Sequence, residues 1–110
     1  MDKCTYHIKL INQFVNCYKN NKINECLELV SDNIVFISSH NDTLHGKEQF
    51  KIYLSKNKLV GSITQPYWSA MDRTYRFDVK NKFLFIKIKT KHLIKFNDNK
   101  QIEYYHITYC

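Results

Sequence analysis

The first part of the chain has the apolar spacing of helices. From Tyr6 to Tyr18, apolar side chains recur at steps of three and four residues, at positions Ile8, Ile11, Phe14, Val15 and Tyr18. This spacing predicts an amphipathic helix with one apolar stripe. Asn20 and Asn21 suit its left-handed end, and Asn24 then caps a short predicted helix over Glu25–Val30.

A strand and a third helix follow in the pattern. Ile34–Ser38 is rich in β-branched and aromatic residues, which favours a strand, and the polar segment Ser39–Asp42 is typical of a turn. Gly46 opens the third predicted helix, which runs from Lys47 to about Asn57. Its apolar face consists of Phe50, Ile52, Tyr53 and Leu54.

After Gly61 the spacing of apolar residues changes to two, as in strands. Thr64–Trp68 and Thr74–Val79 are predicted strands, and Ser69–Asp72 between them is a bulge, a bend or a loop. Pro66 favours an edge position or the start of a strand, because proline has no N–H to offer a sheet.

A long strand is predicted from Phe83 to Phe96, after a turn at Lys80–Lys82. Lysines alternate with a second set of residues that includes His92 and is mostly apolar. This set is Leu84, Ile86, Ile88, Thr90, His92, Ile94 and Phe96. The alternation predicts a half-buried strand whose lysines face water.

The last predicted strand, Gln101–Tyr109, follows a hairpin turn at Asn97–Lys100 and is apolar or aromatic on both faces. One face carries Ile102, Tyr104, His106 and Thr108, and we expect this face to meet the helices. The other face carries Tyr105, Ile107 and Tyr109. We expect these three residues to form the interface of a twofold homodimer.

Size and composition are those of a single globular domain over residues 1–110, with 44% hydrophobic residues. No segment approaches the roughly 20 apolar residues that span a bilayer, so we expect no membrane partner. The polar start of the chain lacks the features of a secretory signal, which favours an intracellular location, cytoplasmic or nuclear.

The charge is strongly basic, at +7, and basic proteins bind the phosphates of nucleic acids. However, 15 of the 17 basic residues are lysines, whereas arginine suits bidentate contacts with bases and phosphates. The abundance of Lys, Asn, Ile and Tyr also fits an AT-rich genome. A nucleic-acid partner is therefore not favoured over a solvated basic face.

The cysteines and histidines do not have the spacing of metal ligands. Cys4, Cys17, Cys26 and Cys110 lack the short separations that zinc sites and redox pairs use, and we expect them to be reduced thiols. No pair of histidines has the spacing of a helical metal site. We expect neither a metal nor another cofactor.

Four segments together carry a family resemblance that covers nearly the whole chain. They are Phe14–Tyr18, Leu27–Phe36, Gly46–Phe50 and Ile94–His106. In this order and spacing they resemble the SnoaL-like members of the nuclear transport factor 2-like superfamily. The resemblance implies an α+β fold in which three N-terminal helices pack on a strongly curved mixed sheet. Such a cystatin-like cone holds an apolar pocket and is often dimeric through the outer face of its sheet.

The implied pocket has a predominantly aromatic lining. Its predicted residues are Phe14, Tyr18, Phe36, Trp68, Tyr75, Ile88, His92, Ile94, Tyr104 and His106. The ketosteroid isomerase-like pattern of the superfamily needs a base Asp and an oxyanion hole of a Tyr plus a protonated Asp. These positions fall on Ser38, Phe14 and His92, so all three groups are absent.

Another acid and base set in the superfamily, the Asp-Arg-Asp of limonene epoxide hydrolase-like enzymes, also has no convincing counterpart. The charged residues Asp72, Arg73, Arg76 and Asp78 lie in or near one predicted strand, where a surface ion-pair ladder is the simpler interpretation. His92 is the one candidate catalytic residue, as a general acid or base. Its alternative role is that of a buried histidine satisfied by a tyrosine hydroxyl.

Three functions remain open from the sequence. The favoured hypothesis is a non-catalytic, homodimeric domain whose apolar pocket binds a small hydrophobic ligand, or which binds a protein partner. The second is a SnoaL-like isomerase, cyclase or dehydratase that uses His92. The third is a basic adaptor that binds nucleic acid or a protein cargo.

Overall fold

The structure is a computed structural model that describes residues 2–110, apart from the side chain of residue 83. Within these residues it has three helices and seven strands. In chain order they are α1 (Lys3–Lys19), α2 (Ile23–Leu27), β1 (Val30–Ile37), β2 (Thr43–His45), α3 (Lys47–Lys56), β3 (Ser62–Ile63), β4 (Tyr67–Ser69), β5 (Thr74–Phe83), β6 (Ile86–Phe96) and β7 (Ile102–Tyr109).

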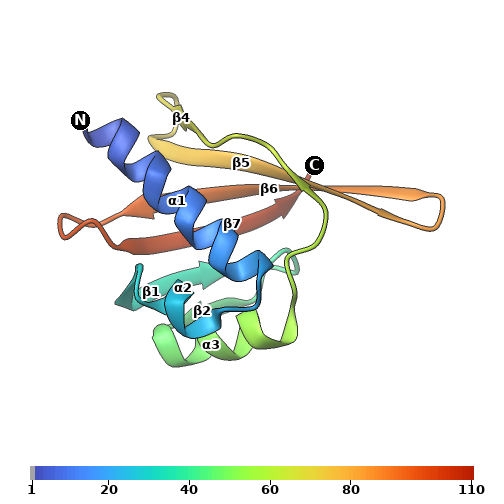
Figure 1. Ribbon diagram of the computed structural model, residues 1–110, viewed down its shortest axis with the longest axis horizontal. Helices are drawn as coiled ribbons and strands as arrows, with labels where there is room; N and C mark the ends of the chain where they lie inside the picture. The colour runs from blue at the N-terminus through green and yellow to red at the C-terminus, as the bar shows by residue number, and fades with distance from the viewer. Residues whose placement is uncertain (1) are drawn as a thin grey trace.

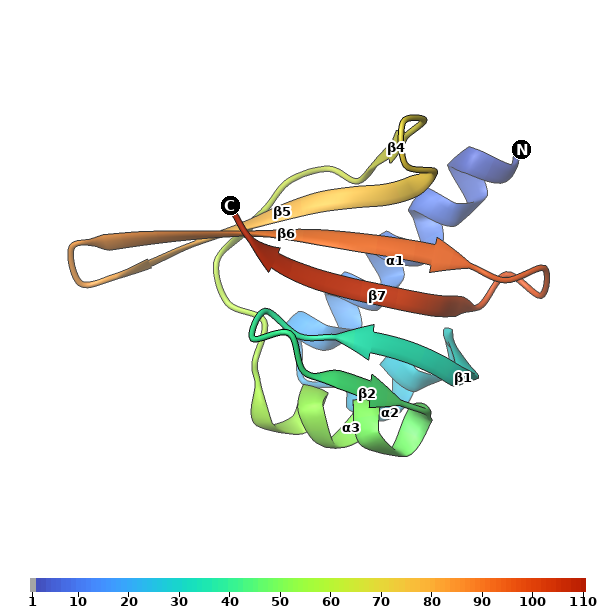
Figure 2. The same ribbon diagram turned by 180° about the vertical axis from the view of Figure 1, so that it is seen from behind.

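All seven strands belong to one curved sheet with the order β2-β1-β7-β6-β5-β3, and β4 pairs with β5 beside β3. The sheet is mixed, because β1 and β7 run parallel while the other neighbours are antiparallel. In Figure 1, α1 crosses one face of the sheet, and α2 and α3 lie toward its β1–β2 edge. Figure 2 shows the opposite face without a helix over it. The predicted α+β architecture is confirmed.

Helix α1 forms where its apolar stripe predicts it. Asp2 caps its start, since the Asp2 carboxylate accepts a hydrogen bond of 2.8 Å from the backbone N–H of Thr5. Such a cap stabilises the first turn of the helix by satisfying a free backbone N–H. The helix ends before Asn21, whose φ of 59° is the left-handed turn expected from the two asparagines.

An aromatic cluster fills the space between α1 and the sheet. Phe14, Phe36, Phe50 and Tyr105 are fully buried and come from α1, β1, α3 and β7. The ring of Tyr105 lies 5.3 to 6.1 Å from the other three ring centroids. The helical and strand-rich halves of the chain therefore share one core.

The face assignment of β7 from the sequence is wrong for its central residues. Tyr105 and Ile107 are 0% and 7% exposed and belong to the core, whereas Tyr104 is half-buried on the outer face. The reason is a bulge: Lys95 pairs with Tyr104, but the next residue of β6 pairs with Ile102. One extra residue in β7 inverts the alternation that follows.

The turn predicted at Lys80–Lys82 is also absent, because β5 continues to Phe83 and the chain reverses at Leu84 and Phe85. The two strands extend beyond the body as a ribbon (Figure 1). Ile86 and Ile88 are therefore 63% and 39% exposed, so the predicted half-burial of this strand is wrong for its first residues. The alternation of side chains is present, but no helix covers that end.

The strand predicted over Thr64–Trp68 is divided into β3 and β4, both of which pair with β5. Pro66 lies in the connection, since it has no N–H for the ladder. Gly61 precedes β3 with a φ of 117°, and a Cβ there would lie 2.3 Å from the Lys80 carbonyl oxygen. Glycine thus permits the close approach of this segment to β5.

Candidate functional site

The ten predicted pocket residues do not form one pocket, because the core aromatics occupy the centre of the fold. Phe14, Phe36 and Ile94 are fully buried in the core; Tyr18, Ile88 and His92 line one cavity; Trp68 and Tyr75 line a second cavity; Tyr104 and His106 lie half-buried on strand β7. The structure therefore places five of the ten residues at two separate cavities and the other five outside them.

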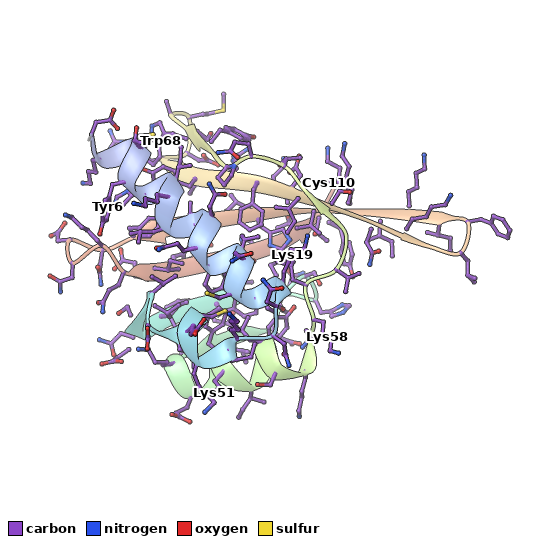
Figure 3. All side chains as sticks on the ribbon, viewed as in Figure 1. Tyr6, Lys19, Lys51, Lys58, Trp68 and Cys110 are labelled. Carbon is purple, nitrogen blue, oxygen red and sulfur yellow. The ribbon has the colours of Figure 1, made fainter. Side chains whose placement is uncertain are left out.

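The first cavity, called here the mouth cavity, has a volume of about 360 Å³ and lies where the β5–β6 ribbon leaves the body. Its wall includes Tyr18, Tyr53, Asn57, Leu59, Val60, Val79, Ile88, Thr90, His92, Ile107 and Tyr109. The segment after α3 passes across this end of the sheet, and Figure 3 shows Lys58 on it. The mouth cavity therefore has walls from both halves of the chain.

His92 borders the mouth cavity but is only 3% exposed. Its Nδ1 atom is hydrogen-bonded to the Tyr105 hydroxyl at 2.6 Å, and its Nε2 atom to the Thr90 hydroxyl at 2.9 Å. The imidazole also stacks on the ring of Phe77, with centroids 4.7 Å apart. Both ring nitrogens are thus engaged within the protein.

The electrostatics of His92 match this geometry. Burial lowers the pKa of His92 to about 4, and the Asp78 carboxylate has a smaller, opposite effect. At neutral pH the ring is uncharged, with one nitrogen as donor and the other as acceptor. The arrangement is that of a buried histidine satisfied by a tyrosine hydroxyl, and neither nitrogen is free to exchange a proton with a molecule in the cavity.

Tyrosine hydroxyls complete the polar part of this region. Tyr18 donates a hydrogen bond to the backbone carbonyl of Asn57, which attaches the segment after α3 to α1. Burial raises the pKa values of Tyr18 and Tyr53, so both phenols are neutral donors near pH 7. Tyr53 can donate a hydrogen bond to a polar group of a ligand, whereas Tyr18, whose O–H is engaged with Asn57, can only accept one.

None of the three positions of the ketosteroid isomerase-like pattern carries a side chain that is free to act as an acid or base. Phe14 is a core residue without a hydroxyl. The Ser38 hydroxyl oxygen accepts hydrogen bonds from the backbone N–H groups of His40 and Asp42, at 3.3 and 3.2 Å, so it stabilises a turn. His92 is engaged as described above, so none of these three positions presents a free base.

The second cavity, called here the N-terminal cavity, has a volume of about 400 Å³ and includes Trp68 and Tyr75. Figure 3 shows Trp68 near the start of α1. His7 also lines this cavity. Its Nδ1 atom lies 2.8 Å from the Tyr75 hydroxyl, and its ring stacks on Phe96 with ring centroids 4.1 Å apart. Burial lowers the pKa of His7, and Lys3 and Lys100 act in the same direction.

His7 was not among the predicted site residues, although the sequence pattern indicates that it is buried. Position 7 lies four residues before Ile11 and seven before Phe14, so it extends the apolar stripe of α1. A histidine on that stripe is buried with the stripe, as its 4% exposure shows.

Three of the four charged residues that the sequence placed in an ion-pair ladder near β5 form ion pairs, and Arg73 lines the N-terminal cavity instead. Arg76 pairs with Asp72, and this hydrogen bond holds the pKa of Asp72 down at about 2. Lys89 lies 3.5 Å from the Asp78 carboxylate. These contacts neutralise the carboxylates of Asp72 and Asp78 on the surface near β5.

Within residues 2–110, the structure has no group of three His, Cys, Asp or Glu side chains arranged to hold a metal ion. None of the helices described in that range is long and apolar enough to cross a membrane.

No protein-family model and no curated protein matches the sequence. Solved structures do match. A candidate ketosteroid isomerase from Kribbella flavida superposes with a TM-score of 0.80 and 7% identity over 97% of this chain and 79% of that protein. A candidate SnoaL-like polyketide cyclase from Shewanella denitrificans gives 0.75 and 10%, covering 96% and 90%. An NTF2-like protein of unknown function from Cytophaga hutchinsonii gives 0.75 and 12%, covering 92% and 87%.

At these identities the similarity concerns the fold, and it agrees with the resemblance seen in the sequence. The chain has the nuclear transport factor 2-like fold. Because that fold hosts both enzymes and binding domains, function has to be argued from the cavities and surfaces of this chain.

Proposed function

We propose that this nuclear transport factor 2-like domain is a non-catalytic binder that takes a small apolar or aromatic molecule in its mouth cavity. The observation that carries the proposal is a cavity of about 360 Å³ beside a histidine whose two ring nitrogens are both engaged. The volume lies within the range of about 300 to 1,000 Å³ typical of ligand sites.

The lining indicates the chemistry of the ligand. Leu59, Val60 and Ile88 supply apolar surface, and Tyr53 and Tyr109 supply aromatic surface. Val60 and Tyr109 are each 55% exposed, so the cavity is open to solvent on their side.

A few polar groups of the cavity can fix the ligand's orientation. Thr90, Asn57 and Ser39 are neutral hydrogen-bonding residues in the wall. Lys58 is the charged residue of the lining. A flat, mostly apolar molecule with one polar or acidic end fits this distribution best.

We predict that filling the cavity weakens binding of an apolar probe. Val60→Trp should reduce the affinity for 1-anilinonaphthalene-8-sulfonate at least tenfold, because the larger side chain occupies the opening; a tenfold loss corresponds to about 1.4 kcal/mol. The measurement is a fluorescence titration. Met71→Trp is the matched control, since Met71 is exposed and lies outside both cavities. Equal affinities for the two variants would contradict the proposed site.

The enzyme hypothesis makes a different prediction for the same site. If a compound bound in the mouth cavity were converted to product, and His92→Asn abolished the conversion while leaving binding intact, the non-catalytic proposal would fail. The hydrogen bonds of His92 argue for the opposite result, in which no conversion depends on this side chain.

We further propose that the domain is a homodimer through the outer face of its sheet. Ile37, His106, Leu93 and Arg76 lie side by side across β1, β7, β6 and β5, and all four are half-buried. Figure 2 shows that no helix covers this face. His106 Nε2 and Arg76 Nε are buried atoms without a hydrogen-bond partner, and a second copy could supply partners.

A charge on this face should separate the proposed dimer. Leu93→Glu is expected to raise the dimer dissociation constant at least a hundredfold, because an unpaired charge would be buried at the interface; a hundredfold change is about 2.7 kcal/mol. Sedimentation equilibrium measures it. Ile52→Glu on α3 is the control, and a wild-type protein that is monomeric at high concentration would contradict the proposal.

An intracellular setting completes the proposal. All four cysteines are free thiols in the structure, and Cys26 is buried in the core. Free thiols suit a reducing compartment, where disulfides do not persist.

A further inference from the structure

The ribbon of β5 and β6 has features that ligand binding does not use. Residues 80–91 of this ribbon are called here the arm. Its residues 81–88 pair only across the arm, in register from Asn81 with Ile88 to Phe83 with Ile86. The arm extends from the body in both views (Figures 1 and 2).

The tip of the arm is apolar and exposed. Leu84, Phe85 and Ile86 are 75%, 97% and 63% exposed, in consecutive positions. Single exposed apolar residues are common on protein surfaces, but three in a row at the end of a projecting hairpin are not. Burying them against an apolar environment would be favourable.

Lysines surround the tip and are not neutralised by the arm itself. The arm contains five lysines and no acidic residue. Lys82 lies directly opposite Lys87 on the two strands, and Lys80 lies directly opposite Lys89, which also pairs with Asp78 below the arm. Like charges in such cross-strand pairs repel one another, so an anionic partner would relieve a cost that the free protein bears.

We propose that the arm docks this protein on the surface of an anionic membrane. The apolar tip inserts into the boundary between headgroups and acyl chains, while the lysines contact lipid phosphates. The lysines at positions 82 and 87 flank residues 83–86, so two residues per strand form the inserted part. At about 3.3 Å per residue this part reaches about 7 Å, the depth to which interfacial segments are buried.

The apolar tip favours a membrane over a nucleic acid as the anionic partner. Phosphate neutralisation by lysines alone would serve either one. Leu84 and Phe85 add nothing to contacts with a phosphate backbone, whereas both gain from leaving water in a lipid interface. The sequence predicted no membrane partner because it has no segment long enough to span a bilayer. A hairpin that docks on the membrane surface does not need a spanning segment.

Docking would also place the mouth cavity close to the lipid surface. Ile88 belongs to both the arm and the cavity wall. An apolar ligand dissolved in the bilayer would then enter from the membrane side. This last step rests on the proposed function, whereas membrane docking by the arm does not.

The test is sedimentation of the whole protein with vesicles of phosphatidylcholine containing about 30% phosphatidylserine. Wild-type protein should bind these vesicles and bind pure phosphatidylcholine at least tenfold more weakly. Lys82→Gln with Lys87→Gln should weaken binding about 25-fold, at about fivefold for each lysine. Leu84→Ser with Phe85→Ser should weaken it at least tenfold.

Matched controls distinguish the effect of the arm from a general effect of positive charge or of exposed apolar side chains. Lys9→Gln with Lys19→Gln removes two exposed lysines from α1, and Met71→Ser removes an apolar side chain as exposed as Phe85. These controls should bind like wild type. Arm variants that also bind like wild type would overturn the proposal, as would equal binding to neutral and anionic vesicles.

A second measurement reports insertion directly. In a Trp68→Phe background, Phe85→Trp should give fluorescence that shifts to shorter wavelength with anionic vesicles and is quenched by brominated lipid chains. Unchanged emission would overturn tip insertion. The proposal would also be overturned if the arm variants weakened binding to a single-stranded oligonucleotide but not to vesicles. The arm would then bind nucleic acid rather than a membrane.

Discussion

Tyr105→Ala is expected to lower the free energy of unfolding by about 3 to 5 kcal/mol, the range for large aromatic core residues. Tyr105 is fully buried and contacts the rings of Phe14, Phe36 and Phe50. Its removal leaves a cavity at the place where helices and sheet meet. Urea denaturation followed by circular dichroism measures the change.

A second variant of Tyr105 separates hydrogen bonding from packing, and a variant of its neighbour Tyr104 is the control. Tyr105→Phe keeps the ring but leaves His92 Nδ1 without its 2.6 Å partner, so we expect a loss of about 1 to 3 kcal/mol. Tyr104→Ala, one residue earlier on the outer face, should cost about 1 kcal/mol or less. If the two alanine variants lost equal stability, the inward position of Tyr105 would be wrong.

Acid should destabilise the protein through His92. An unfolded histidine takes up a proton as the pH falls below about 6.5, whereas buried His92 stays neutral down to about pH 4. The unfolded state therefore binds more protons in this window, and stability falls as the pH falls. The loss is about 3 kcal/mol between neutral pH and pH 4, from about 1.4 kcal/mol for each unit of pKa difference.

The measurement is the free energy of unfolding in urea at several pH values. His92→Gln should flatten the dependence between pH 4 and 6.5, while His40→Gln, at an exposed histidine, should leave it unchanged. His7 contributes in the same direction, since its pKa is also lowered by burial. An NMR titration of the His92 ring with a midpoint near 6.5 would contradict the buried, neutral state.

Both predictions concern the same buried chain of groups, Thr90, His92 and Tyr105. This chain connects the mouth cavity to the aromatic core. A histidine held in this way contributes to stability and to the shape of the cavity wall.

The local pattern of apolar residues was sufficient to predict the helices and strands that bury one of their faces in the core. The stripe of α1 and the alternation of lysines along β6 follow from periods of 3.6 and 2, which need no knowledge of the rest of the chain. The order of these elements also sufficed to indicate the nuclear transport factor 2-like fold, even though identity with the matching structures is 7 to 12%.

The local patterns did not determine which face of β7 is buried, because the inward side of a strand depends on a bulge one residue long. Without the extra residue at Glu103, Tyr104 rather than Tyr105 would have joined the core. The same limit applies to the arm, whose alternation is that of a covered strand. Only the absence of a helix over that end decided that Ile86 is exposed.

The candidate site divides in the same way. The sequence by itself determined that Phe14, Ser38 and His92 replace a known catalytic set, since residue identity settles which acids and bases exist. Only the tertiary structure decided that Tyr105 engages His92 and that aromatic side chains fill the centre of the fold. Those contacts join residues far apart in the chain, and their geometry depends on how all the layers pack together.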